Sequence, residues 1–293
     1  MHKIIVITGP TAVGKTKLSI ELAKKYDGEI INADAVQVYK GLNIGSAKVT
    51  EEEKEGIPHH LLDFKEVTEE YTIYHYQKDC REKIKDIQSR NKTPILVGGT
   101  GLYIKAALYD YKLSEEKSTN TYDNLTNEEL YEELKKLDKD IIIDKDNRRR
   151  LIRAINYYKE NNESINKNKT NKLLYNVIFI GLTTDRQVLY DKINKRVDEM
   201  ISQGLLEEVK SFYDKGIKSK PLLNAIGYRE LYNYLDGNGT KEEAIEKIKQ
   251  NSRHYAKRQY TFFNHQLPVV WFETDYNNFN NTIEKVASYI DSN

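Results

Sequence analysis

The sequence predicts an α/β fold in which a parallel sheet is flanked by helices and a small helical domain is inserted into the chain. The first observation is a series of short apolar runs, each bounded by a helix-like or glycine-containing segment, which is typical of buried parallel strands. The predicted strands are Lys3–Thr8, Glu29–Ala33, Thr93–Val97 and Asn176–Leu182.

The second observation is that segments with helical periodicity alternate with these runs. Such alternation of strand and helix indicates a doubly wound sheet. The predicted helices are Lys15–Tyr26, Tyr74–Arg90, Asn127–Leu137, Asn147–Asn161, Arg186–Gln203, Leu205–Lys215 and Lys241–Phe263.

The third observation concerns residues 113–173, which contain no run of the buried-strand kind. They read as polar helices joined by connectors rich in Asn, Lys and Ser. Because this stretch lies between two predicted core strands, we expect it to project from one edge of the sheet. The predicted domains are a core of residues 1–112 and 174–293, with C-terminal helices, and a helical insertion of residues 113–173.

Composition and charge exclude several classes of protein. The 293 residues suffice for one α/β core and a smaller domain, and the formal net charge of +1 means that any basic surface must be local. No apolar run approaches the ~20 residues of a membrane span, and the chain enters its first strand at once, so we expect a cytoplasmic protein. The single cysteine, Cys80, is expected to be an inert thiol.

A glycine-rich segment, Gly9-Pro-Thr-Ala-Val-Gly-Lys-Thr16, joins the first predicted strand to the first predicted helix. In such a turn, successive backbone N–H groups and the helix N-terminus form a cradle for a di- or triphosphate. The lysine adds a point charge, and the threonine hydroxyl can hold Mg²⁺. The pattern predicts a P-loop NTPase-like core that binds a polyphosphate through Gly9, Pro10, Thr11, Ala12, Val13, Gly14, Lys15 and Thr16.

Other polar motifs follow the predicted strands, whose carboxyl ends meet at one edge of a parallel sheet. Asp34 follows the second strand, and it can hold Mg²⁺ through water, act as a general base, or be only a helix N-cap or a surface carboxylate. The Gly98–Gly101 turn, which contains Thr100, follows the third strand and is expected to face the same cleft. Arg229 is a candidate second clamp on the phosphates. The adjacent histidines His59 and His60 are expected to be structural, because neighbouring side chains splay apart and no further ligand cluster exists.

Two stretches are rich in cations. Either one alone is more often a solvated face, but together they suit a polyanion such as RNA. The first stretch contains Lys145, Arg148, Arg149, Arg150, Arg153, Lys159, Lys167, Lys169 and Lys172, and the second contains Lys247, Lys249, Arg253, Lys257 and Arg258.

The chain resembles the bacterial tRNA dimethylallyltransferases over nearly its whole length. The resemblance rests on several motifs in order rather than on any one of them. These are Gly9–Thr16, Asp34-Ala-Val-Gln-Val-Tyr-Lys-Gly41, Ile44-Gly-Ser-Ala-Lys48, Pro58-His-His-Leu-Leu-Asp63, Val97-Gly-Gly-Thr-Gly-Leu-Tyr103, Arg149-Arg-Leu-Ile-Arg-Ala154, Gly204-Leu-Leu-Glu-Glu-Val209, Ile226-Gly-Tyr-Arg-Glu230 and Tyr255-Ala-Lys-Arg-Gln259.

The resemblance implies that the loop binds the diphosphate of dimethylallyl diphosphate, with Thr16 serving Mg²⁺. It implies catalytic roles for Asp34 as the base on the adenine amine, for Thr100 near the reacting centre, and for Arg229 on the diphosphate. It further implies that the inserted domain grips the anticodon arm, and we expect the protein to be a monomer. The residues expected to contact tRNA are Asp34, Ala35, Val36, Gln37, Arg149, Arg150, Leu151, Ile152, Arg153, Lys257 and Arg258.

Three other functions share some of these features. A P-loop kinase acting on a nucleotide or small alcohol would use the same loop and Mg²⁺, with an arginine-rich lid over the γ-phosphate. An enzyme that prenylates free adenine nucleotides would not need two basic stretches. A non-catalytic RNA-binding switch driven by nucleotide would leave Asp34 without a role.

Overall fold

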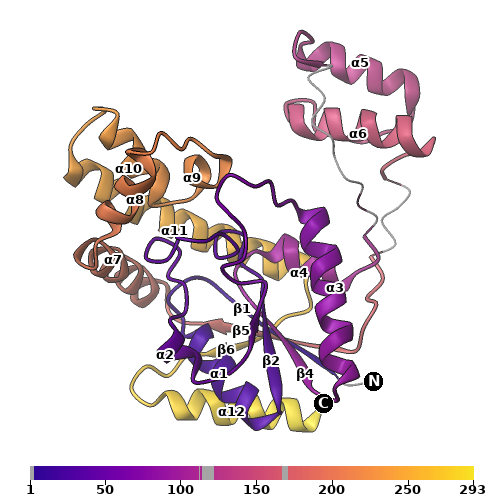
Figure 1. Cartoon of the computed structure of the whole chain (residues 1–293). Helices are drawn as coiled ribbons and strands as arrows, with labels where there is room; N and C mark the ends of the chain where they lie inside the picture. The colour runs from indigo at the N-terminus through magenta and orange to yellow at the C-terminus, as the bar shows by residue number, and fades with distance from the viewer. Residues whose placement is uncertain (1–2, 112, 114–121, 167–170) are drawn as a thin grey trace. The chain divides into compact units, whose positions relative to one another are not determined.

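The protein is described by a computed structural model covering residues 3–111, 113, 122–166 and 171–293. In it, six parallel strands form one sheet in the order β3-β2-β4-β1-β5-β6 (Figure 1). The α/β class and the parallel sheet predicted from the sequence are therefore confirmed. The strands are β1 (Ile4–Thr8), β2 (Gly28–Asn32), β3 (His59–His60), β4 (Thr93–Val97), β5 (Val177–Thr183) and β6 (Val270–Glu273).

The four predicted strands form the centre of the sheet, where β1 pairs with both β4 and β5 through Ile5, opposite Ile95 and Ile178. The two edge strands were not predicted. The β3 strand has only two residues, and β6 is partly exposed, so neither produces the apolar run that marks a buried strand.

All seven predicted helices are present, with ends close to those expected. They are α1 (Lys15–Lys25), α3 (Ile73–Ser89), α5 (Asn127–Leu137), α6 (Arg148–Asn161), α7 (Arg186–Ser202), α8 (Leu205–Tyr213) and α11 (Lys241–Gln266). The structure adds α2 (Glu51–Lys54), α4 (Gly101–Leu108), α9 (Lys220–Asn224), α10 (Tyr228–Leu235) and α12 (Phe279–Ser292). No helix in these described ranges is both long and apolar enough to cross a membrane.

Helices α1 and α12 lie together against the sheet (Figure 1). Ile5 and Ile7 of β1 share a hydrophobic cluster with Leu22 of α1 and Val286 of α12. This packing fixes the start of α1, and with it the glycine-rich loop, at the carboxyl end of β1.

The chain divides into two compact units, one of residues 1–107 and 175–293 and one of residues 108–174. The boundaries predicted from the sequence are 113 and 173. The second unit has its own core, in which Leu130 and Leu134 of α5 pack with Leu151 and Ile155 of α6. The two ends of this unit are joined by a hydrogen bond, in which the backbone N–H of Leu174 donates to the carbonyl of Leu108 at 2.9 Å.

A close backbone contact sets the turn after β4. A Cβ on Gly98 would lie 2.2 Å from the carbonyl carbon of Ala33, so only glycine fits here. The expected turn then runs directly into α4, which begins at Gly101. The turn after β4 and the turn after β2 are consequently in contact.

Glu29 of β2 is a buried carboxylate, only 3% exposed. Its Oε2 accepts a hydrogen bond from Arg90 at 2.9 Å and pairs with His60 Nε2 at 2.7 Å. The Arg90 guanidinium, aided by His60, lowers the pKa of Glu29 to about 2. This role of His60, together with a 2.8 Å contact from His59 to the carbonyl of Ile57, confirms that both histidines are structural.

We expect this carboxylate to make stability depend on pH. Because the folded pKa of Glu29 is about 2, below the 4.5 of an unperturbed glutamate, its stabilisation is complete above pH 4.5 and is lost progressively as the pH falls towards 2. Glu29→Gln should lower the free energy of unfolding at pH 6 by on the order of 2 kcal/mol and flatten its decline between pH 5 and 3. Urea unfolding at several pH values measures both effects.

The matched control is Glu52→Gln, which changes an exposed carboxylate on α2. It should leave the pH dependence unchanged. Equal slopes for the wild type and Glu29→Gln would contradict the assigned ionic interaction.

Candidate active site

One cleft of 1380 Å³ in the first unit is lined by most of the predicted site residues of that unit. Its walls come from the glycine-rich loop, the segments after β2 and β4, and helices α7, α10 and α11. The carboxyl ends of the parallel strands thus meet at one cleft, as the sequence predicted.

The glycine-rich loop leads from β1 into α1. Gly14 stands at the N-cap of α1 with a left-handed φ of 92°, and a Cβ there would lie 2.6 Å from the ring of Phe279. A glycine is therefore required by conformation and by space. Thr11, Ala12, Gly14, Lys15 and Thr16 all line the cleft, whereas Val13 points its side chain into the core.

Lys15 is a partly buried cation at the start of α1. Its Nζ donates to the carbonyl of Pro10 at 2.5 Å. Burial, reinforced by the nearby charge of Arg196, lowers the pKa of Lys15 to about 7, and Asp34 opposes that shift. The charge of Lys15 is thus held only weakly in the absence of an anion.

Arg196 of α7 is a second cation at the loop, and the sequence did not predict it. Its Nη1 donates to Thr11 Oγ1 at 3.1 Å, and burial lowers the pKa of its guanidinium. The sequence did contain a sign of this position. Arg196 falls on the same face of α7 as the buried residues Leu189 and Ile193, so it places a charge on an otherwise apolar face.

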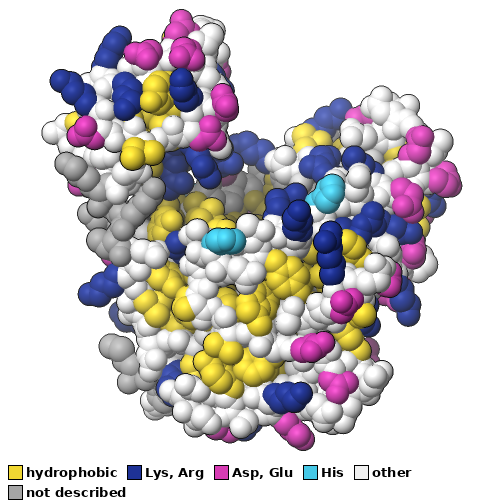
Figure 2. Space-filling model, turned by 180° about the vertical axis from the view of Figure 1, so that it is seen from behind, with side chains coloured by type: hydrophobic (Ala, Val, Ile, Leu, Met, Phe, Trp, Pro, Cys, Tyr) yellow, Lys and Arg dark blue, Asp and Glu magenta, His cyan; other side chains and the backbone are white. Residues whose placement is uncertain are grey.

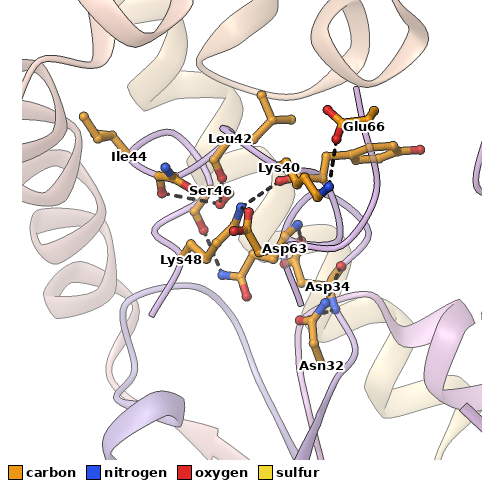
Figure 3. A network of polar contacts seen from close by, with 12 residues as sticks. Asn32, Asp34, Lys40, Leu42, Ile44, Ser46, Lys48, Asp63 and Glu66 are labelled. Carbon is orange, nitrogen blue, oxygen red and sulfur yellow. Dashed lines mark hydrogen bonds and ion pairs between the residues drawn. The ribbon is translucent and has the colours of Figure 1, made fainter. Parts of the chain in front are cut away.

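Asp34 stands where the chain leaves β2. Its Oδ1 accepts the backbone N–H of Val36 at 2.9 Å and of Gln37 at 3.4 Å, and its own N–H donates to Asn32 Oδ1 at 3.1 Å (Figure 3). Asp34 therefore caps a turn through one oxygen. Its charge also raises the pKa of both Lys15 and Arg196, so the carboxylate lies within electrostatic reach of both cations.

Thr100 connects the turns after β2 and β4. Its Oγ1 accepts the backbone N–H of Ala35 at 3.0 Å, and its hydroxyl is hydrogen-bonded to the phenol of Tyr255 on α11. Gln259, one helical turn further, donates to the carbonyl of Gly99 at 3.1 Å. Tyr255 and Gln259 were not predicted as site residues, although both belong to a motif that carries the family resemblance.

Gln37 and the segment after it form another wall of the cleft. The Gln37 side-chain amide donates to the carbonyls of Ser46 and Ala47 at 2.9 and 3.2 Å. Glu208 of α8 accepts the backbone N–H groups of residues 43, 44 and 45 at 2.8–3.1 Å. Figure 3 shows the contacts that stabilise this segment, including that of Lys48 with Asp63. Ala35 and Val36 also line the cleft.

Arg229 lies in the same cleft, and its guanidinium is hydrogen-bonded to its neighbour in sequence. Its Nη2 donates to Glu230 Oε1 at 2.6 Å, and its side chain is 44% exposed. Its contact with a diphosphate stays a prediction. The arginine that contacts the glycine-rich loop is Arg196.

The basic stretches contain both structural and exposed cations. On α11, Lys249 pairs with Asp198 at 2.7 Å and Arg253 donates to Asn194, whereas Lys257 and Arg258 are exposed. The Arg258 guanidinium lies 5.7 Å from the ring centroid of Tyr255.

In the second unit, Arg149 and Arg150 are exposed at the start of α6, and Ile152 and Arg153 are partly buried. Leu151 is fully buried in that unit's core, so its side chain is not available to tRNA, and the predicted tRNA contact at this position stays a prediction. Arg148 is also structural, because it donates to the carbonyls of Leu125 and Tyr122. Lys167 and Lys169 lie outside the described residues.

Cys80 is buried, and burial raises the pKa of its thiol to about 12, as expected for an unreactive cysteine.

Among the described residues, no group of three or more His, Cys, Asp or Glu side chains is arranged to hold a metal ion. Both signs of charge are spread over the surface seen in Figure 2.

Known proteins match this chain over nearly its whole length. A family model described as IPP transferase matches residues 37–266. The chain is 50% identical over 300 residues to a tRNA dimethylallyltransferase of Anoxybacillus flavithermus, covering 99% of this chain and 96% of that protein. It is 49% identical over 303 residues to the tRNA dimethylallyltransferase of Geobacillus thermodenitrificans, covering 99% and 96%.

Solved structures agree as well. The tRNA delta(2)-isopentenylpyrophosphate transferase of Staphylococcus epidermidis matches with a TM-score of 0.77 and 40% identity, covering 100% of this chain and 99% of that one. A eukaryotic dimethylallyltransferase acting on tRNA matches with a TM-score of 0.88 and 30% identity, covering 100% and 79%. The match of the family model and this degree of identity over nearly the whole chain show that the protein belongs to the IPP transferase family.

Proposed function

We propose that this protein transfers a dimethylallyl group from dimethylallyl diphosphate to the exocyclic N6 amine of the adenine on the 3′ side of the anticodon in tRNA, releasing diphosphate. The observation that carries the proposal is that the Asp34 carboxylate, Lys15 and Arg196 line one cleft. The tRNA dimethylallyltransferases that are about half identical to this chain support the same activity.

The reaction forms a C–N bond to the amine and breaks the C–O bond to diphosphate. The amine is a poor nucleophile because its lone pair is delocalised into the ring, so attack requires an allylic carbon with carbocation character and a base. Both backbone bonds to the Asp34 carboxylate go to Oδ1, and Oδ2 can accept the amine proton.

Negative charge accumulates on the departing diphosphate. The loop amides, the N-terminus of α1, Lys15 and Arg196 stabilise that charge as it develops. Thr100 and Tyr255 form the wall beside Asp34, where the adenine would be positioned after leaving its stack.

Mg²⁺ fits this site as an ion bound by both the protein and the diphosphate. The Thr16 hydroxyl lines the cleft, and Mg²⁺ in proteins commonly takes few side-chain ligands and completes its shell with phosphate oxygens and water. Bound there, the ion would neutralise charge on the leaving group.

The exposed cations of α6 and α11 are suited to tRNA phosphates. Arg149 and Arg150 on α6 and Lys257 and Arg258 on α11 are exposed members of the two basic stretches. Such contacts position RNA without reading its sequence. Membership in the IPP transferase family favours prenyl transfer over the kinase alternative.

We expect Asp34→Asn to lower kcat by ~10²–10⁴-fold while leaving the Kd for tRNA nearly unchanged. The amide keeps an oxygen that can accept the N–H of Val36, so the turn should persist while the base is removed. Transfer of radiolabelled dimethylallyl groups to unmodified tRNA measures turnover. Asp291→Asn, which changes an exposed carboxylate of α12 paired with Lys25, is the control. Equal decreases in rate and in tRNA affinity would assign Asp34 a scaffold role instead.

We expect diphosphate binding to take up protons near pH 8. Lys15 has a pKa of about 7 without the anion, so it is largely neutral at pH 8, and a bound anion raises that pKa and restores the charge. Calorimetric titration with inorganic diphosphate in two buffers of different ionisation enthalpy counts these protons. In Lys15→Arg the arginine remains charged before and after binding, so it takes up no proton. Only protonation changes of the diphosphate itself should then be measured. Identical uptake in both proteins would place the titrating group elsewhere.

We expect Arg149→Ala and Arg150→Ala each to weaken tRNA binding and to reduce the slope of log Kd against log salt by about 0.7–0.9 for every phosphate that the variant no longer neutralises. Filter binding over a range of salt concentrations measures the slope. Lys285→Ala removes an exposed cation from α12 and controls for net charge, so its slope should stay at the wild-type value. Unchanged slopes in both arginine variants would show that tRNA binds at other residues.

A further inference from the structure

The segment that links β6 to α12, together with the first residue of α12, contacts three successive residues of the glycine-rich loop. Thr274 Oγ1 donates to the carbonyl of Val13 at 3.0 Å, and the Tyr276 hydroxyl donates to the carbonyl of Ala12 at 3.3 Å. The ring of Phe279 lies against Gly14, where it fills the space that a side chain would occupy. We call residues 274–279 the C-terminal brace.

These contacts determine which way the loop peptides face. In a trans peptide, the carbonyl of one residue and the N–H of the next point in opposite directions. Because the carbonyls of Ala12 and Val13 are bonded to the brace, the N–H groups of Val13 and Gly14 are directed away from it. Those two N–H groups belong to the loop that forms the predicted anion cradle.

The loop conformation requires support from outside. Ala12 has a φ of 67°, in the left-handed region that a residue with a side chain rarely adopts. A loop with such a residue relaxes unless its surroundings hold it. The carbonyl of this same Ala12 is the one bonded to Tyr276.

The brace is itself firmly attached to the core. Thr274 is 5% exposed, and its N–H donates to the carbonyl of Thr183 at the end of β5 at 2.8 Å. The phenol of Tyr276 is also hydrogen-bonded to the Thr184 side chain, and the Lys192 ammonium of α7 lies 3.7 Å from its ring centroid. The brace therefore connects the loop to the sheet through hydrogen bonds.

We propose that Thr274 and Tyr276 are positioning residues that hold the loop in its diphosphate-binding conformation. This inference rests on the proposed function, since it assumes that the loop binds the diphosphate of the prenyl donor. It assigns a function to a segment that the sequence did not predict as part of the site, and it separates donor binding from tRNA binding.

The test compares Thr274→Val, Tyr276→Phe and the double variant with the wild type. Each substitution removes a hydroxyl and keeps the shape of the side chain. We expect Thr274→Val to raise the Kd for inorganic diphosphate, measured by calorimetry with Mg²⁺, and the KM for dimethylallyl diphosphate by about 10-fold. Tyr276→Phe, which removes a longer hydrogen bond, should raise both by a few fold. The Kd for tRNA should not change, and hydrogen exchange should accelerate in the loop peptide but not in α12.

The matched control is Tyr26→Phe, which removes a hydroxyl that bonds α12 instead, at the carbonyl of Ala287. It should leave the Kd for diphosphate and the loop exchange at wild-type values. Wild-type diphosphate binding in the double variant would overturn the proposal, as would a rise in Kd for Tyr26→Phe equal to that for Thr274→Val. If the wild type itself neither binds diphosphate nor prenylates tRNA, the proposed function fails, and loop exchange alone then decides whether the brace supports the loop.

Discussion

The concentration of positive charge at the glycine-rich loop is the constraint on which the rest of the site depends. Lys15 and Arg196 lie close enough for the charge of Arg196 to lower the pKa of Lys15, and burial lowers the pKa of both. Two cations in such surroundings are stable only beside a compensating charge. Asp34 supplies part of it, and a bound diphosphate would supply the rest. The same arrangement places the Asp34 carboxylate near the glycine-rich loop, as the proposed alkyl transfer to an amine would require.

Helix α11 contacts two parts of the cleft that lie on different elements. Tyr255 and Gln259 on one side of the helix contact the turns around Thr100 and Gly99, where the acceptor base is proposed to lie. Lys249, nearer its start, pairs with Asp198 of α7, the helix that carries Arg196. A single long helix therefore contacts the turns around Thr100 and Gly99 and also supports α7, the helix that carries Arg196.

The second unit shows how a stretch of cations divides into structural and exposed groups. Leu151 and Ile155 face the small core between α5 and α6, and this amphipathic arrangement leaves Arg149 and Arg150 exposed. Arg148, the adjacent residue, instead binds two backbone carbonyls. Of three consecutive arginines, one is therefore structural and two are exposed. The position of Leu151 on the apolar face of α6 explains why it is buried.

The sequence by itself determined the four central strands, the glycine-rich loop and the positions of Asp34 and Thr100, because each depends on local features: an apolar run, a glycine pattern, or a polar residue just after a strand. It did not determine Arg196 as the cation at the loop, nor the brace formed by Thr274 and Tyr276. These residues lie far along the chain from Gly9–Thr16, and only the parallel pairing of β1 with β5 and of β5 with β6 brings their segments to it. Tertiary structure decided them because a long-range contact depends on how strands and helices pack together, which the residues on either side of each partner do not encode.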